Sequence, residues 1–343
     1  MVVPQGTLLS EGGGAMRDVK RAIVFGGAGF IGCHLLKRLA DLRRYDRLYS
    51  VDIAEPRFIT AAVDYVNFDI REPIPPNLCG EGPFDVFNFA AVHTTPGHED
   101  WEYYWTNVHG ATNVCRFASE VAADYLLFTS TMMVYGPTEA PKDEDAALEP
   151  VNAYGRSKIL AEGIHRLWQA ERSGKRRLTI VRPGVVYGPA ERGNFTRLAR
   201  ALRQRRFVYP GRTDTIKACG YVEDLVASMV EMGERNDGVF LYNFCHPQRY
   251  TSKDICAAFA KVGGYAEPRI VVPFWLLGLA ASAFEALSAL GLKTDINRAR
   301  VRKLYQSTNM VPKRLPAAGF RYQYDLPAGL AAWKRSSRTI DFD

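Results

Sequence analysis

A tyrosine and a lysine four positions apart are the residues of this chain best suited to proton chemistry. They are Tyr154 and Lys158 in YGRSK, within a stretch from 153 to 170 that we expect to be helical, so both side chains lie on one helix face. A tyrosine with a pKa of about 10 is a poor base at neutral pH, but a nearby ammonium stabilises the phenolate and lowers that pKa. Thr131 follows the strand-like run YLLFTS and could hold a substrate oxygen beside Tyr154. The three residues could therefore move a proton while an alcohol or ketone exchanges a hydride.

A dinucleotide-binding motif supports this interpretation, because a helical tyrosine and lysine at this spacing are by themselves more often a surface pair. Gly26, Gly29 and Gly32 in GGAGFIG fall between the strand-like run RAIVF and a helix beginning near Phe30. There the first glycine permits a tight turn, the second lets the backbone approach a pyrophosphate, and the third allows close helix packing. The N-terminus of the helix also favours an anion. We expect the backbone of Phe30 and Ile31 to contribute to the same cofactor site.

An acidic residue then selects among dinucleotides. Asp52 ends the run RLYSVD, twenty residues after Gly32, where a carboxylate can accept hydrogen bonds from the adenosine ribose. Because a carboxylate there repels a 2′-phosphate, we predict NAD rather than NADP. Asp52 could instead be a solvated residue at the end of a strand, but the glycines upstream favour the cofactor role.

The elements that must position these residues alternate between strand-like and helical runs from Lys20 to about Pro183. Such alternation is typical of a parallel sheet with right-handed crossovers. We therefore predict an α/β fold, a Rossmann-like doubly wound parallel sheet with a smaller C-terminal substrate-binding lobe. The expected parts are a disordered extension at 1–19, an NAD-binding Rossmann domain at 20–183 and a mainly substrate-binding lobe at 184–343. The lobe is partly interleaved with the first domain, because the later run VFLYNF can return to the sheet.

Composition narrows the class of protein. The chain has 343 residues, of which 47% are hydrophobic, enough for a large core. Its six cysteines form no CxxC pair and no cluster with histidines, so we predict neither disulfides nor a metal site, and a cytoplasmic location. The net charge of +7 is spread among mixed acids and bases, which favours a small phosphorylated substrate over nucleic acid. Residues 1–16 lack the pattern of a signal peptide.

One strongly apolar segment, VVPFWLLGLAASAFEALSALGL at 271–292, is close to membrane-spanning length. Pro273 near its start and Glu285 inside it argue against a bilayer span, because a carboxylate in the middle of a membrane helix costs about 2.5 to 3.5 kcal/mol. We expect a helix packed on the substrate lobe. Peripheral contact with a membrane is the alternative.

In the order and spacing of these motifs the sequence resembles the extended short-chain dehydrogenase/reductases, and in particular their nucleotide-sugar epimerase/dehydratase branch. The resemblance runs from about Lys20 to Trp333 and adds FDIR, NFAAVH, TNVHGATNV, RPGVVYGP and YVEDL to the motifs above. It implies an NAD-dependent enzyme with Thr131, Tyr154 and Lys158 as catalytic residues. It also implies that further residues line the cofactor: Asp69 and Ile70 beside the adenine, Ala90, Ala91, Asn107, and Pro183 near the nicotinamide.

Two methionines discriminate among the reactions of this branch. Sugar 4,6-dehydratases of the family place an Asp-Glu pair directly after the catalytic threonine, and a decarboxylase uses a glutamate there, whereas this chain has Met132 and Met133. The resemblance therefore leaves 4-epimerisation or simple redox chemistry. In the epimerase mechanism that it implies, Tyr154 removes a hydroxyl proton of a nucleotide sugar, NAD takes the hydride, the keto-sugar rotates, and the hydride returns to the opposite face.

The resemblance also implies residues that face the phosphates of the substrate. The nearest matches to the phosphate-facing residues of the family are Asn194, Lys217 and Arg300. Lys217 stands where an arginine is usual, which replaces a bidentate fork by a point charge. The helical stretches 99–122 and 153–170 resemble the pair that forms a four-helix dimer interface in this family, so a homodimer is expected.

Two other functions remain open at this stage. A 3β-hydroxysteroid or sterol-type dehydrogenase shares the YxxSK motif and often has a hydrophobic C-terminal segment, and it would form NADH from a lipophilic alcohol. A non-catalytic dinucleotide-binding regulator is the other alternative. Such regulators typically lose the tyrosine or the lysine, and this chain has both.

Overall fold

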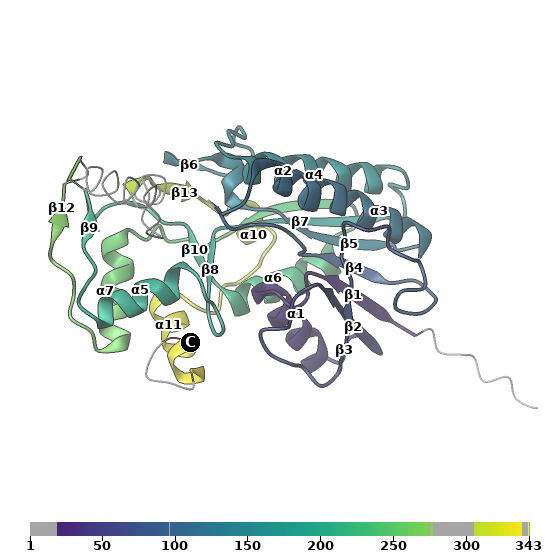
Figure 1. Ribbon diagram of the computed structural model, residues 1–343, viewed down its shortest axis with the longest axis horizontal. Helices are drawn as coiled ribbons and strands as arrows, with labels where there is room; N and C mark the ends of the chain where they lie inside the picture. The colour runs from purple at the N-terminus through teal and green to yellow at the C-terminus, as the bar shows by residue number, and fades with distance from the viewer. Residues whose placement is uncertain (1–18, 96, 274, 277–304, 338–341, 343) are drawn as a thin grey trace, which may run out of the picture.

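A seven-stranded parallel sheet forms the centre of the computed structural model, which describes residues 19–95, 97–273, 275–276, 305–337 and 342 (Figure 1). The strands lie in the order β11-β7-β5-β4-β1-β2-β3, and every neighbouring pair is parallel. Their bounds are β1 Arg21–Phe25, β2 Arg47–Asp52, β3 Val63–Asn67, β4 Asp85–Asn88, β5 Tyr125–Thr129, β7 Arg177–Pro183 and β11 Val239–Phe244. The strand order reverses direction between β1 and β4, and in such sheets a crevice for a dinucleotide is expected there, at the carboxyl ends of the strands. The predicted fold class is confirmed.

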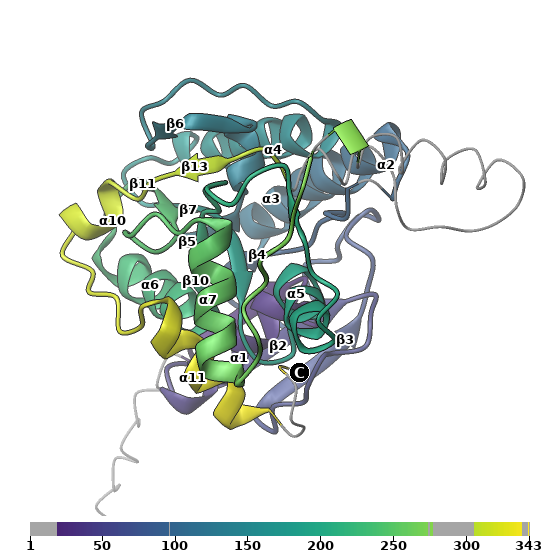
Figure 2. The same ribbon diagram turned by 90° about the vertical axis from the view of Figure 1, so that its left-hand side faces the viewer.

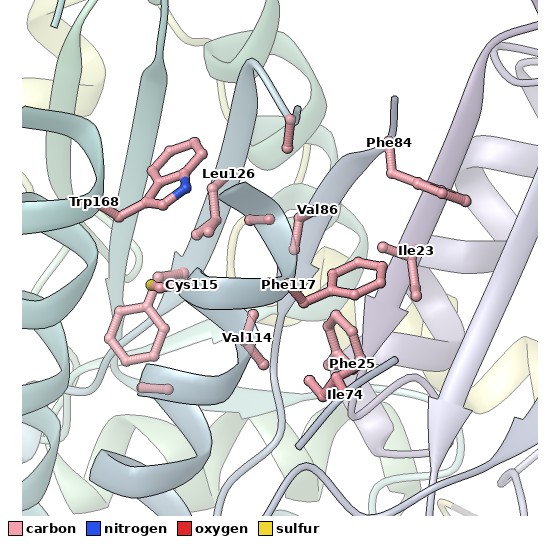
Figure 3. Close-up of a cluster of buried hydrophobic side chains, with 14 of the residues drawn as sticks. Ile23, Phe25, Ile74, Phe84, Val86, Val114, Cys115, Phe117, Leu126 and Trp168 are labelled. Carbon is pink, nitrogen blue, oxygen red and sulfur yellow. The ribbon is translucent and has the colours of Figure 1, made fainter. Parts of the chain in front are cut away.

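Helices cover both faces of this sheet because each presents an apolar stripe to it. One face carries α1 (Phe30–Asp41) and α6 (Val222–Arg235), and the other carries α3 (Gly110–Glu120) and α4 (Ala153–Ala170). Figure 3 shows the core under α3, where Phe117 meets the Phe25 ring edge-on at a centroid distance of 5.5 Å. Both rings are fully buried.

The expected helix at 99–122 contains a change of helical type. It begins as α2 (Asp100–Tyr104), continues as a π-helical turn at Trp105–His109, and returns to α-helix in α3. Glu99 and Glu102 form a capping box at its start. A π-helical turn inserts an extra residue into the turn and often marks a functional site; here it contains Asn107.

The second lobe lies beyond the carboxyl ends of the strands and has a core of its own (Figure 2). Its helices are α5 (Asn194–Arg203), α7 (Ser252–Gly263) and α11 (Leu326–Ser336), whereas α10 (Arg314–Ala317) packs against β11 of the main sheet. Short parallel strand pairs join the lobe together: β8 (Val185–Tyr187) with β10 (Cys219–Tyr221), β9 (Tyr209–Pro210) with β12 (Val271–Val272), and β6 (Thr138–Lys142) with β13 (Thr308–Met310). Tyr187 and Phe195 stack in this core at a centroid distance of 4.7 Å.

After entering this lobe the chain returns to the main sheet, because α6 packs on one face of the sheet and β11 is its edge strand. Residues 1–18 of the expected extension and residues 277–292 of the apolar segment lie outside the described residues. Within the part that is described, no helix is long and apolar enough to cross a bilayer.

Candidate active site

Helix α4 presents the predicted catalytic tyrosine and lysine to the crevice. Asn152 caps the helix by accepting a 2.8 Å hydrogen bond from the amide of Gly155, so Tyr154 lies in the first turn and Lys158 one turn later. Thr131 follows β5 and caps a short 3₁₀ helix (η2, Met132–Tyr135), with its hydroxyl accepting a 3.2 Å bond from the amide of Met133. η2 packs against α4, so residues 131, 154 and 158 come to the same end of the sheet.

Burial dominates the acid–base properties of this pair. It raises the pKa of Tyr154 to about 12, and hydrogen bonding with the Thr131 side chain opposes that rise, which places the two hydroxyls together. Burial also lowers the pKa of Lys158 to about 7, while the charge of Glu162 raises it. A lysine with a pKa near neutrality can change its charge during a reaction. The expected lowering of the Tyr154 pKa by Lys158 stays a prediction.

The Lys158 ammonium has unused hydrogen-bonding capacity. The residue is only 2% exposed, and its Nζ lies 4.3 Å from the centroid of the Phe128 ring. Among the described residues, no group accepts a hydrogen bond from it. A buried ammonium with only a cation–π contact fits a ligand that supplies oxygen acceptors, as the hydroxyls of a nicotinamide ribose would.

The glycine loop between β1 and α1 has the shape that a pyrophosphate requires. Gly26 has a φ of +78°, and a Cβ there would lie 2.4 Å from the backbone nitrogen of Ala90, so the loop passes directly against the end of β4. Gly32 is equally tight, since its Cβ would lie 2.5 Å from the Gly26 carbonyl oxygen. Gly29 caps α1 without a side-chain bond, and a Cβ there would meet only the Gly26 oxygen, at 3.2 Å. The first amides of α1, including those of Phe30 and Ile31, therefore remain available to an anion.

Asp52 is bound to this loop. One carboxylate oxygen accepts a 3.1 Å bond from the amide of Ala28, and the other accepts a 3.1 Å bond from the amide of Ala54. Each oxygen keeps a lone pair for another donor, so the geometry fits ribose hydroxyls at the end of β2. The glycine loop, Asp52 and the ammonium of Lys158 together fit a dinucleotide that spans the crevice.

Three other predicted cofactor residues are used by the protein in ways that the sequence did not show. Asp69 binds Arg71 through both carboxylate oxygens at 2.5–2.9 Å, which lowers the pKa of Asp69. The Ile70 side chain is buried against Gly110 of α3, and its carbonyl accepts a 2.9 Å bond from Asn113, so only its amide remains for the predicted adenine contact. Asn107 uses its amide to hold Val92, at 2.9 and 3.0 Å, and Ser157 of α4, at 2.9 Å.

Asn107 therefore has a structural part in the site. It joins the π-helical turn to the loop after β4, which contains Ala90 and Ala91, and to the helix that carries Tyr154. Pro183 is the last residue of β7, in register with Phe244 of β11, at the carboxyl edge of the sheet.

Two predicted substrate residues, Asn194 and Lys217, are described, and both lie in the second lobe. Asn194 begins α5, and its side-chain oxygen accepts a 2.8 Å bond from Arg197. Lys217 is largely buried, donates a 2.7 Å bond to the carbonyl of Gln306, and has its pKa lowered to about 8 by burial. Arg300 lies outside the described residues. The phosphate-binding roles of all three stay predictions.

Behind the predicted catalytic residues lies a buried charged network that sequence reasoning missed. Glu162, one turn after Lys158, accepts bonds from Arg182 of β7 at 2.8 and 2.7 Å and from Ser130 at 2.5 Å. Both members of the ion pair have side chains 5% exposed. The spacing of residues 154, 158 and 162 along one helix face was a signal for Glu162, but the sequence does not show its partner.

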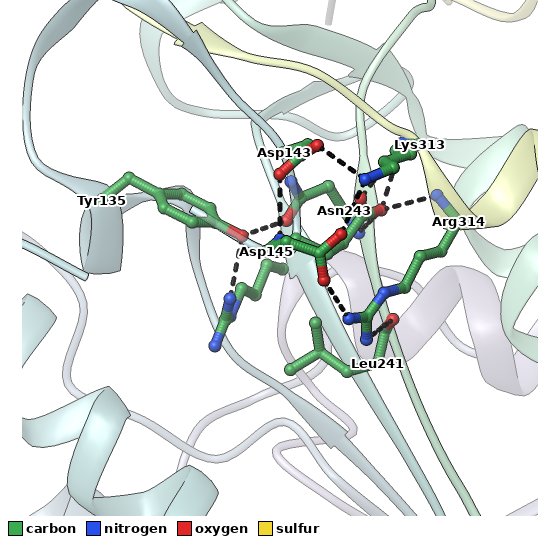
Figure 4. A network of polar contacts seen from close by, with 9 residues as sticks. Tyr135, Asp143, Asp145, Leu241, Asn243, Lys313 and Arg314 are labelled. Carbon is green, nitrogen blue, oxygen red and sulfur yellow. Dashed lines mark hydrogen bonds and ion pairs between the residues drawn. The ribbon is translucent and has the colours of Figure 1, made fainter. Parts of the chain in front are cut away.

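The network continues across the main sheet to its edge strand β11. Arg182 donates a 2.8 Å bond to the Tyr135 hydroxyl, which in turn donates one of 2.8 Å to Asn243. Figure 4 shows Tyr135, Asn243, Lys313 and Arg314 around this junction. Glu144 is also part of it, since its carboxylate accepts bonds from the amides of residues 243, 313 and 314. Helix α4 is thus connected, through β7 and η2, to β11 and to the residues at the start of α10.

Comparisons with known proteins point to one family. Residues 22–243 match the model of the NAD dependent epimerase/dehydratase family. Over 94% of both chains, the sequence is 27% identical to an N-acetyl-alpha-D-glucosaminyl-diphospho-ditrans,octacis-undecaprenol 4-epimerase of Escherichia coli O157:H7. A UDP-glucose 4-epimerase of Lactobacillus helveticus is 28% identical over 51% of this chain and 54% of its own length.

Solved structures share the fold. MoeE5 in complex with UDP-glucuronic acid and NAD has a TM-score of 0.70 at 20% identity, with 91% of this chain and 97% of that chain covered. The UDP-glucuronic acid 4-epimerase from Bacillus cereus, in complex with NAD, has a TM-score of 0.69 at 18% identity, with 91% and 96% covered.

Proposed function

The chain belongs to the NAD dependent epimerase/dehydratase family and is an NAD-dependent enzyme, and from this premise we propose that it is a 4-epimerase of a sugar carried on a diphosphate. The observation that carries the proposal is the meeting of Thr131, Tyr154 and Lys158 at the carboxyl end of β5, followed by Met132 and Met133. That site can oxidise and reduce a hydroxyl. Neither methionine can supply the acid or base that the elimination of water needs.

Each catalytic side chain has a part that follows from its environment. When bound, NAD would supply reversible hydride transfer to and from either face of the sugar carbon. Tyr154 takes the hydroxyl proton at its phenol oxygen and later gives it back, while Thr131 holds the same sugar oxygen. Lys158, whose ammonium has acceptors available only from a ligand, orients the cofactor ribose and stabilises the phenolate. Because no net redox occurs, each turnover would regenerate the NAD that it uses.

The test is proton NMR of the purified protein with a panel of diphosphate sugars and a trace of NAD. A new epimer without stoichiometric NADH is the expected result. Stoichiometric NADH formed from a lipophilic secondary alcohol, with no epimer, would instead establish the dehydrogenase alternative. The Tyr154→Phe variant is the control, because it removes only the phenolic hydroxyl. It should abolish turnover while binding NAD normally.

We also propose that the enzyme is a homodimer built on α2, the π-helical turn and α4. Large apolar side chains on these helices are exposed: Trp101 is 64%, Trp105 45%, Leu160 51% and Leu167 68% exposed. α2 packs against α4, so these residues lie on adjoining helices of one layer. A second copy related by a two-fold axis would bury them in a four-helix interface.

A cytoplasmic location is part of the same proposal. All six cysteines are free thiols and buried, and burial raises the pKa of the Cys115 thiol well above its usual range. Such cysteines serve as small apolar core residues, which suits a reducing compartment.

A further inference from the structure

The edge of the second lobe formed by β9 and β12 exposes large apolar side chains. Ile270, Val271, Trp275 and Leu276, here called the apolar edge, are 63%, 45%, 67% and 46% exposed. β12 pairs with β9, and the pair lies at the end of the molecule farthest from the main sheet (Figure 1). A tryptophan and three aliphatic side chains exposed within seven residues are unusual on a water-facing surface.

Arginines accompany the apolar edge. Arg205 and Arg206 are exposed just before β9, and Arg269 is exposed just before Ile270. Because β9 and β12 run parallel with Tyr209 opposite Val271, the residues that precede the two strands lie near one another. Glu267 is an acidic residue close to Arg269 in the sequence. Within the described residues, none of the three arginines forms an ion pair with it or with any other acid. The surface thus combines apolar side chains with free positive charge.

We propose that the apolar edge and these arginines dock the second lobe on an anionic lipid bilayer, where the enzyme meets a sugar diphosphate carried on a lipid. Tryptophan and aliphatic side chains enter the interface of a bilayer, while arginines remain at the level of the phosphate headgroups. The sequence that follows Leu276, LGLAASAFEALSALGL, contains one charged residue in sixteen.

The second half of this proposal rests on the proposed 4-epimerase activity. From Pro210 the chain continues through Gly211, whose amide bonds the carbonyl of Val272 at 2.8 Å, to Lys217, a predicted phosphate residue. The docking surface and the expected diphosphate position thus lie on one short segment. The relative that matches 94% of both chains is named for a sugar on diphospho-undecaprenol, whereas the UDP-glucose 4-epimerase matches half of this chain.

The docking test is flotation of the full chain with vesicles of phosphatidylcholine alone and of phosphatidylcholine with phosphatidylglycerol at equal parts. Binding to the anionic vesicles, weakened by salt, is expected. The Arg205→Gln/Arg206→Gln variant should lose about 25-fold in partitioning, since each arginine near an anionic surface contributes about fivefold. Arg172→Gln/Lys175→Gln is the matched control, because both residues are exposed in the turn after α4, and it should bind like the unaltered protein.

The apolar contribution is tested with Leu276→Ser, and Leu42→Ser is its control because Leu42 is 51% exposed at the end of α1. Leu276→Ser should float less and Leu42→Ser should not. If the protein binds neither kind of vesicle, or if all variants float equally, the proposed docking surface is wrong. A smaller mass of Leu276→Ser in vesicle-free solution would also contradict it, because that surface would then bind a second copy of the chain.

The substrate is tested separately with N-acetylglucosamine on undecaprenyl diphosphate in these vesicles and on UDP in solution. Faster epimer formation from the lipid-linked sugar supports the proposal. Turnover of the UDP-sugar alone contradicts the proposal that the substrate is carried on a lipid. If the protein binds vesicles but forms no epimer from either substrate, the docking surface stands and the proposed function fails.

Discussion

Glu162 binds Arg182 through two hydrogen bonds of 2.8 and 2.7 Å, one helical turn beyond Lys158, which we propose to be catalytic. The pair is buried, and the glutamate is the charge that raises the pKa of Lys158 against the effect of burial. Ser130 adds a third bond to Glu162 beside Thr131. The pair therefore links the position of β7 to the charge of the residue expected to hold the cofactor.

We predict that Glu162→Gln shifts the pH profile of NAD affinity to lower pH. Without the glutamate charge the pKa of Lys158 falls further, so the ammonium is lost earlier as pH rises. The variant also leaves Arg182 buried and unpaired, which should reduce the free energy of unfolding by about 3–5 kcal/mol. Titration of NAD binding from pH 6 to pH 9 and urea unfolding measure the two effects.

The double variant Glu162→Gln/Arg182→Met separates charge from structure. It removes the unpaired arginine and should regain much of the stability while keeping the altered pH profile. A double variant whose pH profile returns to that of the unaltered protein would show that Glu162 acts only by holding the fold.

Stability itself should depend on Lys158 in the absence of NAD. Its pKa is about 7 in the folded protein, below the usual 10.5, so between these values the unfolded chain binds a proton that the folded chain does not. The free energy of unfolding therefore rises with pH across this window, by on the order of a few kcal/mol from this group. Lys158→Met should flatten that rise in urea unfolding at pH 7, 8 and 9, and an unchanged slope would contradict the assignment.

Local motifs were the part of the site that the sequence could predict. The glycine loop, Asp52 and the Tyr154–Lys158 pair each depend on a short segment whose residue types set its own conformation. Arg182 could not be predicted as the partner of Glu162, because it comes from a strand twenty residues later that the sheet brings beneath α4. The helical pattern at 99–122 was correct, but it could not show the π-helical turn that directs Asn107 to Val92. In the second lobe the predicted substrate residues lie on short strands and loops, whose contacts the sequence does not show. The bond from Lys217 to the carbonyl of Gln306 is an example.

The glycines of the cofactor loop should differ in what they contribute. Gly29→Ala introduces a Cβ that meets only the Gly26 oxygen, and the extended backbone there suits alanine, so the free energy of unfolding should change by less than about 1 kcal/mol. The same methyl group lies where the pyrophosphate must approach, so NAD affinity should fall at least about tenfold. Calorimetric titration with NAD and thermal unfolding measure the two quantities.

Gly26→Ala is the matched comparison. Its Cβ would lie 2.4 Å from the Ala90 nitrogen at a positive φ, so it should lower both stability and NAD affinity. Equal losses of stability in the two variants would show that Gly29 serves the fold rather than the cofactor.

A charge on the exposed face of α4 should separate the proposed dimer. Leu167 is 68% exposed near the end of α4, on the same layer as Trp101 and Trp105. Leu167→Glu would place a carboxylate in the four-helix interface without a partner, and burying an unpaired charge is costly enough to favour the monomer. Light scattering should report twice the chain mass for the unaltered protein and a single chain for this variant. Leu42→Glu, on the far side of the sheet at the end of α1, should remain dimeric. The predicted cofactor residues all come from one chain, so a monomeric Leu167→Glu variant should still bind NAD. An unaltered protein that is already monomeric would refute the interface.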